Sequence, residues 1–340
     1  MSNRKILFGG IMIGAVLTAL ILWSFMIVSS KPIGSSAAML YIDEDDNADS
    51  VFHKLENGIA GSSLHGLKTI CKVKGYDKYV KSGAYQFKPK HTCLDIYRTL
   101  SRGHQTPVKL IVPNLRTVDR IIGKISEQIM ADSAKIAEIV FDSAQYSSLG
   151  FNHETLPALF IPNTYEVYWN MSAEKLMKRL VREYNKYWNE KRRTKAAEIG
   201  LTPIEVSILA SIVDEETANN AEKPMVAGLY INRLKRGMLL QADPTVKFAM
   251  QNFTLKRILQ KHLHTDSPYN TYKYAGLPPG PIRVPSLQAL ESVLNYTRHK
   301  YLYMCAKEDF SGTHNFAVTL SQHNANARRY QQELNRRKIR

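Results

Sequence analysis

The chain has 340 residues, of which 44% are hydrophobic, and carries a formal net charge of +16. This composition excludes a disordered or fibrous protein, and the length suffices for one large domain or two ordinary ones. Three cysteines are too few for a disulfide framework and lack the spacing of metal ligands. Cys71 and Cys93 would be able to pair in an oxidising compartment, whereas the alternative is that both are buried free thiols.

The first predicted element is an apolar segment near the N-terminus. Residues 6–28 carry no charge and follow Arg4 and Lys5. A helix of about 20 such residues spans a bilayer, whereas the apolar core of a cleaved signal peptide is usually about 7 to 15 residues long. We therefore expect a transmembrane helix over 6–28, with residues 1–5 in the cytoplasm and a tether over 29–38 leading outward. A cleaved signal peptide is the alternative.

The positive charge points to anionic partners. A basic surface in a cytosolic protein is typical of nucleic-acid binding, but nucleic acid is largely absent outside the membrane. We therefore expect no nucleic-acid partner. Membrane lipid headgroups and the cell-wall polymer are the remaining anionic candidates.

Short strands and short helices alternate over residues 39–126. Strands are expected at 39–42, around 83–87 and at 106–112, with helices between them. This alternation predicts a small α+β module. Helical segments dominate afterwards, and one of them is expected to run unbroken from its cap at Ser172 to Gly200. We therefore predict an α+β chain with a transmembrane helix, a small module and a larger mixed domain over 127–340.

A helix that carries consecutive acidic residues is the first candidate for chemistry. Thr202, Pro203 and Glu205 have the pattern of a helix start with a capping box. The apolar stretch that follows leads into three acids, Asp214, Glu215 and Glu216. Counted at about 100° per residue, Asp214 points away from the apolar face and into solvent, and Glu215 lies at the edge of that face. Glu216 falls at the centre of that face.

A carboxyl group against apolar walls keeps its proton to higher pH, as a general acid of a glycosidase requires. Glu216 is therefore the candidate general acid. The alternative is that the helix ends by Val213 and all three acids are solvated.

A second helix is expected at 223–237, followed by a loop rich in Pro, Gly and Tyr at 267–286. Asn270, Thr271 and Tyr272 in this loop have the donors, acceptors and aromatic face that suit sugar recognition. The run of Lys261 to His264 resembles a metal site only weakly, so we expect neither a metal nor another cofactor.

Four stretches resemble successive signatures of the MltG (YceG-like) endolytic murein transglycosylases. They are ASIVDEET, INRLKRGMLLQADPTV, YNTYKYAGLPPGPI and KYLYMCAKEDFSGTHNFAVTLSQHN, spread over residues 201–330. The resemblance implies a LysM-like subdomain at 39–126 and a catalytic transglycosylase domain at 127–340. The chain departs from the family pattern at residues 113–115 and 159–165, which affects the wall-binding part more than the catalytic part.

The resemblance also implies roles for individual residues. The catalytic glutamate of the family's Glu-x-Glu-Thr motif corresponds to Glu216, and Asp214 replaces the first acid. The implied substrate-binding or site-organising residues are Gln241, Asp243, Asn270, Thr271, Tyr272, His314 and Asn324. For His314 and His323 the alternative is a buried structural histidine, and for Asp243 it is a turn cap before Pro244.

The implied reaction cleaves the β-1,4 bond between N-acetylmuramic acid and N-acetylglucosamine in nascent glycan strands and leaves a 1,6-anhydro end. Glu216 acts first as acid and then as base. The implied partners are peptidoglycan strands, membrane lipid and peptidoglycan synthases such as penicillin-binding proteins. The implied location is the plasma membrane, with the catalytic domain outside the cytoplasm. A lysozyme-like hydrolase that uses Asp243 as second carboxylate, and a non-catalytic wall-binding scaffold, are the alternatives.

Overall fold

The computed structural model of the chain describes residues 2–255 and 257–337. Two compact units make up the chain. The first comprises residues up to Leu110 together with Glu166–Met171, and the second comprises Ile111–Tyr165 together with the residues from Ser172 onward. The boundary expected between residues 126 and 127 lies inside the second unit.

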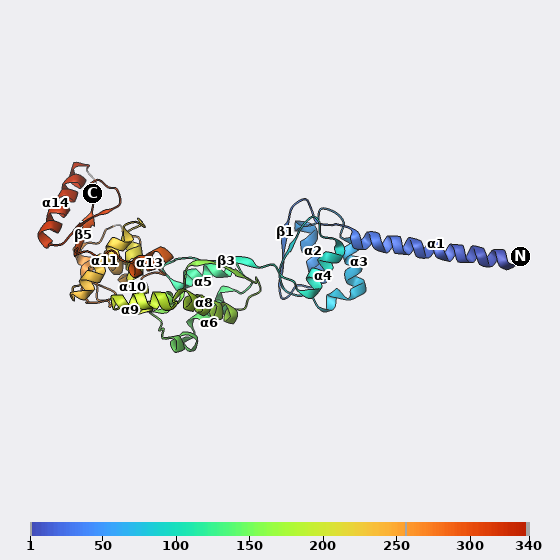
Figure 1. Cartoon of the computed structure of the whole chain (residues 1–340), viewed down its shortest axis with the longest axis horizontal. Coiled ribbons are helices and arrows are strands. Elements are labelled where there is room, and N and C mark those ends of the chain that lie inside the picture. Colours follow the sequence, from blue (N-terminus) through green and yellow to red (C-terminus); the bar gives the residue numbers. More distant parts are fainter. Residues whose placement is uncertain (1, 256, 338–340) are drawn as a thin grey trace. The chain divides into compact units, whose positions relative to one another are not determined.

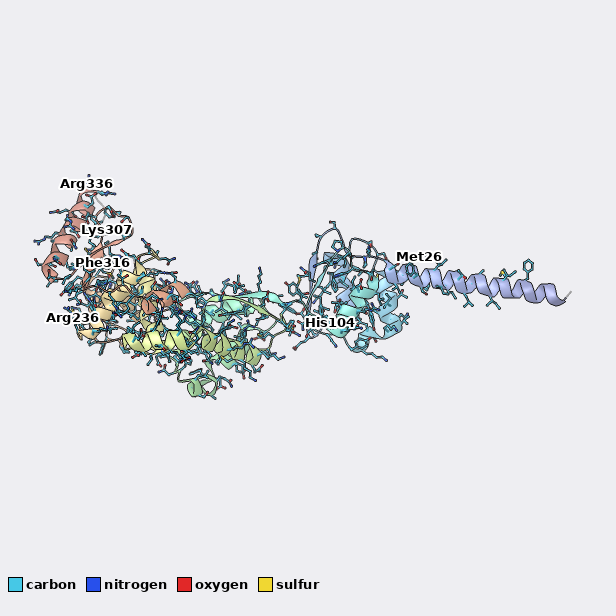
Figure 2. The ribbon with its side chains drawn as sticks, viewed as in Figure 1. Met26, His104, Arg236, Lys307, Phe316 and Arg336 are labelled. Atoms are coloured by element: carbon cyan, nitrogen blue, oxygen red, sulfur yellow. The ribbon has the colours of Figure 1, made fainter. Side chains whose placement is uncertain are left out.

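The first unit begins with α1 (Ser2–Ser29), in which Phe8–Ser29 is long and apolar enough to cross a membrane. Side chains from Phe8 to Met26 are exposed (Figure 2). The end of the helix is different, because Ile27 and Val28 pack against the core of the first unit.

Between α1 and Arg102 the first unit has the order β-α-α-β followed by a further helix (Figure 1). Its strands pair antiparallel, with Ala38 opposite Phe87. The elements are β1 (Ala38–Ile42), α2 (Ala48–Gly58), α3 (His65–Lys74), the short 3-10 helix η1 (Tyr76–Lys78), β2 (Gly83–Phe87) and α4 (Cys93–Arg102). The expected start and end of α4 are confirmed: Thr92 caps its first turn and Gly103 is left-handed with φ 70°. Cys71 and Cys93 are both buried and their thiols are free.

A two-stranded sheet of β3 (Val108–Val112) and β4 (Asn163–Val167) follows in the order of the chain. Between these strands lie α5 (Val118–Ser126), α6 (Ser133–Phe141), α7 (Ser143–Tyr146), η2 (Ser147–Leu149) and η3 (Leu156–Leu159). After β4 come α8 (Ala173–Tyr187), α9 (Glu190–Ile199), α10 (Pro203–Glu216), α11 (Lys223–Lys235), α12 (Asp243–Ala249), η4 (Gln260–His264), α13 (Leu287–Leu294), β5 (Tyr303–Ala306), β6 (His314–Ala317) and α14 (Leu320–Arg336).

The prediction of one unbroken helix from Ser172 to Gly200 is wrong, because α8 and α9 are separate helices. Trp188 has a non-helical backbone, with ψ 57°, and ends α8. The side chain of Asn189 then accepts a hydrogen bond from the backbone of Arg192 and starts α9. The helical pattern is apparently continuous, but the chain breaks between α8 and α9 because the side chain of Asn189 caps a new helix.

Helix α10 is the centre of the second unit. It contacts α9, α11, α12 and α13, and every residue from Val206 to Val213 is buried. Its expected start is confirmed, since Thr202 and Glu205 form the capping box and Pro203 is the first helical residue. Because neighbours surround this helix on all sides, its end is held among protein groups instead of at a solvated face.

Candidate active site

The three acids at the end of α10 remain helical, so the alternative in which the helix ends by Val213 is excluded. Thr217, which is extended, ends the helix. One turn of helix therefore directs the carboxylates of Asp214, Glu215 and Glu216 to three different environments.

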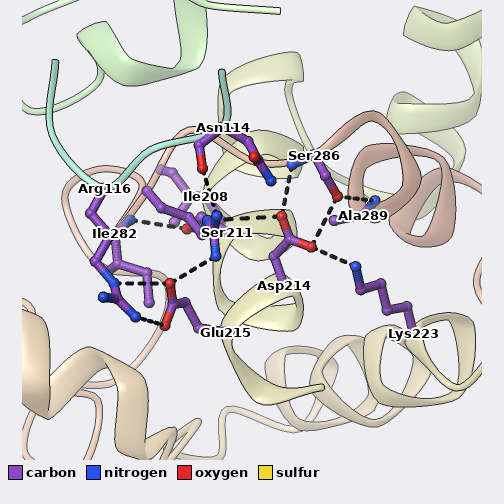
Figure 3. Close-up of polar contacts among 11 residues, drawn as sticks. Asn114, Arg116, Ile208, Ser211, Asp214, Glu215, Lys223, Ile282, Ser286 and Ala289 are labelled. Atoms are coloured by element: carbon purple, nitrogen blue, oxygen red, sulfur yellow. Dashed lines mark hydrogen bonds and ion pairs between the residues drawn. The ribbon is translucent and has the colours of Figure 1, made fainter. Parts of the chain in front are cut away.

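The expectation that Asp214 points into solvent is wrong. Its side chain is only 5% exposed and forms an ion pair with Lys223, with 2.6 Å between Oδ1 and Nζ (Figure 3). The backbone N–H and the hydroxyl of Ser286 also donate to this carboxylate, at 2.7 and 2.9 Å. The angular count assigned this direction to solvent because the pattern of one helix does not reveal the neighbours that cover its polar side.

Glu215 is bound by two arginines. Arg116 donates from Nε and Nη2 to its two carboxylate oxygens, at 3.1 and 2.7 Å, in a bidentate pair. Arg283 donates from Nη1 to Glu215 at 2.9 Å and from Nη2 to the carbonyl of Asn114 at 2.6 Å (Figure 3). These contacts fix the end of α10 against the segments 114–116 and 282–286.

Glu216 lies on another side of the helix end, in a cavity of about 400 Å³. The residues that line this cavity come from α10, α11, the segment before α12, the first residue of α12, the loop at 267–286, β5, β6 and α14. They are Glu216, Leu229, Tyr230, Arg233, Leu240, Gln241, Asp243, Tyr272, Met304, Cys305, Ala306, His314 and His323. Four of the predicted binding residues, Gln241, Asp243, Tyr272 and His314, are therefore brought together with Glu216.

The carboxyl group of Glu216 has a neutral partner. The phenol of Tyr230, from α11, donates a 2.6 Å hydrogen bond to Oε1. Burial raises the pKa of Glu216 to about 7; the bond from Tyr230 lowers this pKa, and the negative charge of Asp243 raises it. Burial likewise raises the pKa of Tyr230 well above its usual value, so Tyr230 remains a donor. Glu216 thus carries a proton near neutral pH, as a general acid must.

Asp243 is exposed at the start of α12, and its carboxylate Oδ1 accepts a 2.6 Å hydrogen bond from the phenol of Tyr272. Burial and this bond raise the pKa of Tyr272. The pair therefore presents one carboxylate and one phenol to the cavity that Glu216 lines.

Gln241 has an unusual backbone, because its φ is 51° and it is not a glycine. Arg233, from α11, holds this turn: its guanidinium donates to the carbonyls of Leu239, Leu240 and Leu302, at 3.1, 2.8 and 2.6 Å. The same Nη1 lies 3.2 Å from Oε1 of Gln241. Such strained residues persist where the surrounding structure over-determines them, and they cluster at functional sites.

The remaining predicted binding residues lie elsewhere. Asn270 and Thr271 are buried and are not part of the cavity lining. The amide of Asn270 donates to the carbonyls of Leu263 and Thr265, and the hydroxyl of Thr271 accepts from the backbone of Ala242. Both side chains thus hold the segments that carry Gln241, Asp243 and Tyr272. Asn324 is exposed on α14 and its neighbour in sequence, His323, lines the cavity instead.

Two histidines line the cavity. Glu222 binds His314 twice: Oε1 accepts from the backbone N–H at 2.6 Å, and Oε2 lies 2.8 Å from Nδ1. His323 stacks on Tyr303, and burial together with the charge of Arg233 lowers its pKa. Within residues 2–255 and 257–337, no three His, Cys, Asp or Glu side chains come together as a metal site.

Sequence reasoning missed Tyr230, Arg233 and Glu222 as parts of the site. Tyr230 has the spacing of an apolar packing face in the expected helix at 223–237, and Arg233 belongs to a basic last turn of the kind that usually lies in solvent. Spacing did contain a signal for Tyr230 and Arg233, since positions three apart share one face of a helix. Glu222 precedes α11 and is 92 residues from His314, so no local pattern connects them.

Comparison with known proteins agrees with this architecture. Residues 40–329 match the model of the YceG-like family. The chain belongs to the YceG-like family. An endolytic murein transglycosylase of Streptococcus pneumoniae serotype 2 is 28% identical over 319 residues, which cover 84% of this chain and 57% of that protein. The Bacillus subtilis endolytic murein transglycosylase is 35% identical over 159 residues, which cover 47% of this chain and 43% of that protein.

The chain thus spans about half the length of the curated relatives it matches. Among solved structures, a putative YceG-like protein from Listeria monocytogenes is similar with a TM-score of 0.57 and 25% identity. That similarity covers 86% of this chain and 99% of the Listeria chain. The α+β fold with small sheets is therefore a YceG-like fold.

Proposed function

We propose that this member of the YceG-like family is a membrane-anchored endolytic lytic transglycosylase of peptidoglycan. The observation that carries the proposal is the environment of Glu216. Its carboxyl group has a pKa raised to about 7, accepts a hydrogen bond from a neutral phenol and lies in a cavity lined by polar side chains. The relatives named endolytic murein transglycosylase support the substrate class.

The reaction begins with proton donation. Protonated Glu216 donates to the oxygen that leaves C1 of N-acetylmuramic acid, and the C1–O bond breaks with its electron pair on that oxygen. The C6 hydroxyl of the same sugar then bonds to C1 and loses its proton, and Glu216 recovers a proton. The products are a 1,6-anhydro end and a new N-acetylglucosamine end, without consumption of water.

The other lining residues bind the glycan in this proposal. Asp243 with Tyr272, and Gln241 on its strained turn, contact sugar hydroxyl and acetamido groups. Asn270 and Thr271 act through the loops they hold, and Asn324 acts through the helix that carries His323. No cofactor takes part.

Membrane attachment follows from α1. In this proposal the helix Phe8–Ser29, which is long and apolar enough to cross a membrane, anchors the chain in the plasma membrane, and the catalytic unit lies outside the cytoplasm, where new glycan strands are made. Peptidoglycan synthases of the penicillin-binding type are the proposed neighbours, and strand termination is the proposed role.

Digestion of defined glycan strands by the full-length chain in detergent micelles tests this function. Mass spectrometry is expected to find anhydro-muramic ends, and Glu216→Gln is expected to lose them. Glu198→Gln, which removes an exposed carboxylate of α9, is the matched control and should digest like the wild type. Reducing ends would instead assign a hydrolase, and intact strands with folded protein would assign a binding scaffold.

The hydrolase alternative rests on one specific observation. Asp243 is near enough to Glu216 for its charge to raise the pKa of Glu216, so two carboxyl groups share the cavity. Paired carboxyl groups are the usual equipment of glycoside hydrolases. Analysis of the reaction in H₂¹⁸O separates the two, because only hydrolysis incorporates ¹⁸O at the new end.

A further inference from the structure

A buried carboxylate orients one histidine of the cavity. The side chain of Glu222 is 8% exposed and that of His314 is 16% exposed, and they join the start of α11 to the first residue of β6. Glu222 accepts from the backbone N–H of His314 at 2.6 Å as well as from its ring. Two bonds to one residue fix both the strand and the ring.

This pairing decides the chemistry of the imidazole. A carboxylate only accepts hydrogen bonds, so Nδ1 of His314 must carry a hydrogen. In the neutral ring Nε2 is then the basic nitrogen, and His314 lines the cavity of Glu216. The N-terminus of α11 favours the negative charge of Glu222, and this charge stabilises an imidazolium when Nε2 takes a proton.

The proposed transglycosylase reaction needs a proton acceptor at the moment of ring closure. Glu216 has just donated its proton, and its Oε1 still holds the phenol of Tyr230. The pair of Glu222 and His314 provides a second, separate site for a proton in the same cavity. General base catalysis of this kind contributes about 10²- to 10⁴-fold.

We propose that His314, oriented by Glu222, takes the proton of the C6 hydroxyl in the transglycosylase reaction, so that Glu216 acts as the acid but not, as the family resemblance implies, also as the base. The C6 oxygen forms its bond to C1 as its O–H bond breaks, and the proton goes to Nε2 of His314. The imidazolium then returns this proton to the carboxylate of Glu216, directly or through solvent, so both residues regain their starting states. His314 is the catalytic residue here, and Glu222 is a positioning residue. The inference rests on the function proposed above.

Two substitutions of His314 separate a base from a simpler role. His314→Asn keeps an amide N–H where Nδ1 donates to Glu222 and removes the group at Nε2. His314→Gln keeps a polar group near Nε2 that binds a hydroxyl but takes no proton. Both variants are expected to lose about 10²-fold or more in kcat, with KM changed by a few-fold at most. Full activity of His314→Asn would assign a structural role, and full activity of His314→Gln would assign binding only; either result overturns the proposal.

The positioning role of Glu222 has its own variant. Glu222→Gln removes the charge and keeps one acceptor oxygen, so its NH2 group stands opposite either the backbone N–H or the ring Nδ1 of His314. We expect kcat to fall by about 10-fold or more with KM unchanged, because the imidazolium loses its counter-charge. An unchanged kcat in folded Glu222→Gln would contradict that role.

A substrate with an activated leaving group distinguishes the base from the acid. Dinitrophenolate leaves without a proton, so Glu216→Gln should recover most of its activity on a dinitrophenyl glycoside of N-acetylmuramic acid. His314→Gln should stay slow on the same substrate, because the C6 hydroxyl still has to lose its proton. Equal recovery of both variants would place His314 on the leaving-group side and overturn the proposal.

Two outcomes separate the transglycosylase function from the role of His314 as base. If the wild-type chain releases no anhydro ends from either substrate, both the transglycosylase function and the base role of His314 are rejected. If the wild type releases anhydro ends and His314→Gln keeps its kcat, the function stands and the base is overturned alone.

Discussion

Two sides of the end of α10 carry acids of the same kind in opposite electrostatic settings. On one side Asp214 and Glu215 meet Lys223, Arg116 and Arg283 in ion pairs of 2.6 to 2.9 Å. On the other side Glu216 bonds directly to a neutral phenol, and burial outweighs the positive charges of Arg233 and Lys247, which lower its pKa. Paired charges hold the helix end in place, whereas Glu216, which forms no ion pair with any cation of residues 2–255 and 257–337, keeps its proton to about pH 7.

This contrast shows why adjacent residues serve different purposes. A buried ion pair stabilises little compared with well-packed apolar groups, but the loss of one partner is costly because the other charge remains buried. The compensated side, where Asp214 and Glu215 are paired with cations, therefore has a fixed position. The uncompensated side, where Glu216 lies, is less stable but has a perturbed pKa, as functional sites commonly do.

The largest effect is expected on the uncompensated side. Glu216→Gln removes the proton donor and should reduce the rate of strand cleavage by about 10³-fold. The shape of the residue is retained, so the fold should persist. Quantified anhydro ends measure the rate, and circular dichroism checks the fold; cleavage within 10-fold of the wild type would refute the assignment of the acid.

The compensated side should respond in stability instead. Lys223→Met leaves Asp214, whose side chain is 5% exposed, without its main cation, and should lower the free energy of unfolding by about 3 kcal/mol. Urea denaturation of the full chain in detergent measures this change. The double variant with Asp214→Leu should recover much of the loss, since no buried charge remains; a double variant as unstable as Lys223→Met would argue against a charge effect.

The raised pKa of Glu216 predicts a stability cost that depends on pH. The folded state keeps this proton up to about pH 7, whereas the ordinary pKa of a glutamate is 4.5. The contribution of the protonated carboxyl group to the free energy of unfolding is therefore complete below pH 4.5 and is lost as the pH rises to 7. Glu216→Gln should therefore be more stable than the wild type at pH 8, by about 2 kcal/mol, and similar to it at pH 4. Thermal unfolding at both values tests this. Cleavage by the wild type should also decline above about pH 7.

A smaller change is expected when Tyr230 loses its hydroxyl. The bond from Tyr230 lowers the pKa of Glu216, so Tyr230→Phe should raise this pKa further and extend activity to higher pH by less than about one unit. Stability should fall by about 1 kcal/mol. The pH profile of kcat/KM is the measurement, and a shift to lower pH would contradict the proposed sign.

The smallest effect is expected at a solvated ion pair. Lys124 and Glu127 are 57% and 61% exposed at a distance of 2.8 Å. Lys124→Ala should change the free energy of unfolding by less than about 0.5 kcal/mol, because water screens the exposed pair. Measured beside Lys223→Met in the same urea experiment, it shows how much the burial of an ion pair matters.

Local patterns predicted much of the second unit. The capping box at Thr202 and Glu205 identified the start of α10, and the same stretch correctly singled out Glu216 as the residue with a perturbed environment. Angular counting along one helix did not predict the surroundings of Asp214, because α10 is covered on all sides. Angular counting also did not predict the break at Asn189, because the helical pattern continues through this residue while its side chain caps a new helix.

The sequence by itself determined the apolar N-terminal helix, the α+β character and the apolar setting of Glu216 on α10. These depend on hydrophobic period, caps and short motifs, which are local properties of the chain. Only the tertiary structure decided which cations neutralise Asp214 and Glu215, which phenol binds Glu216, and that Glu222 holds His314. Those partners come from segments 9 to 99 residues apart, and packing of the whole unit, not any single segment, brings them within hydrogen-bond distance.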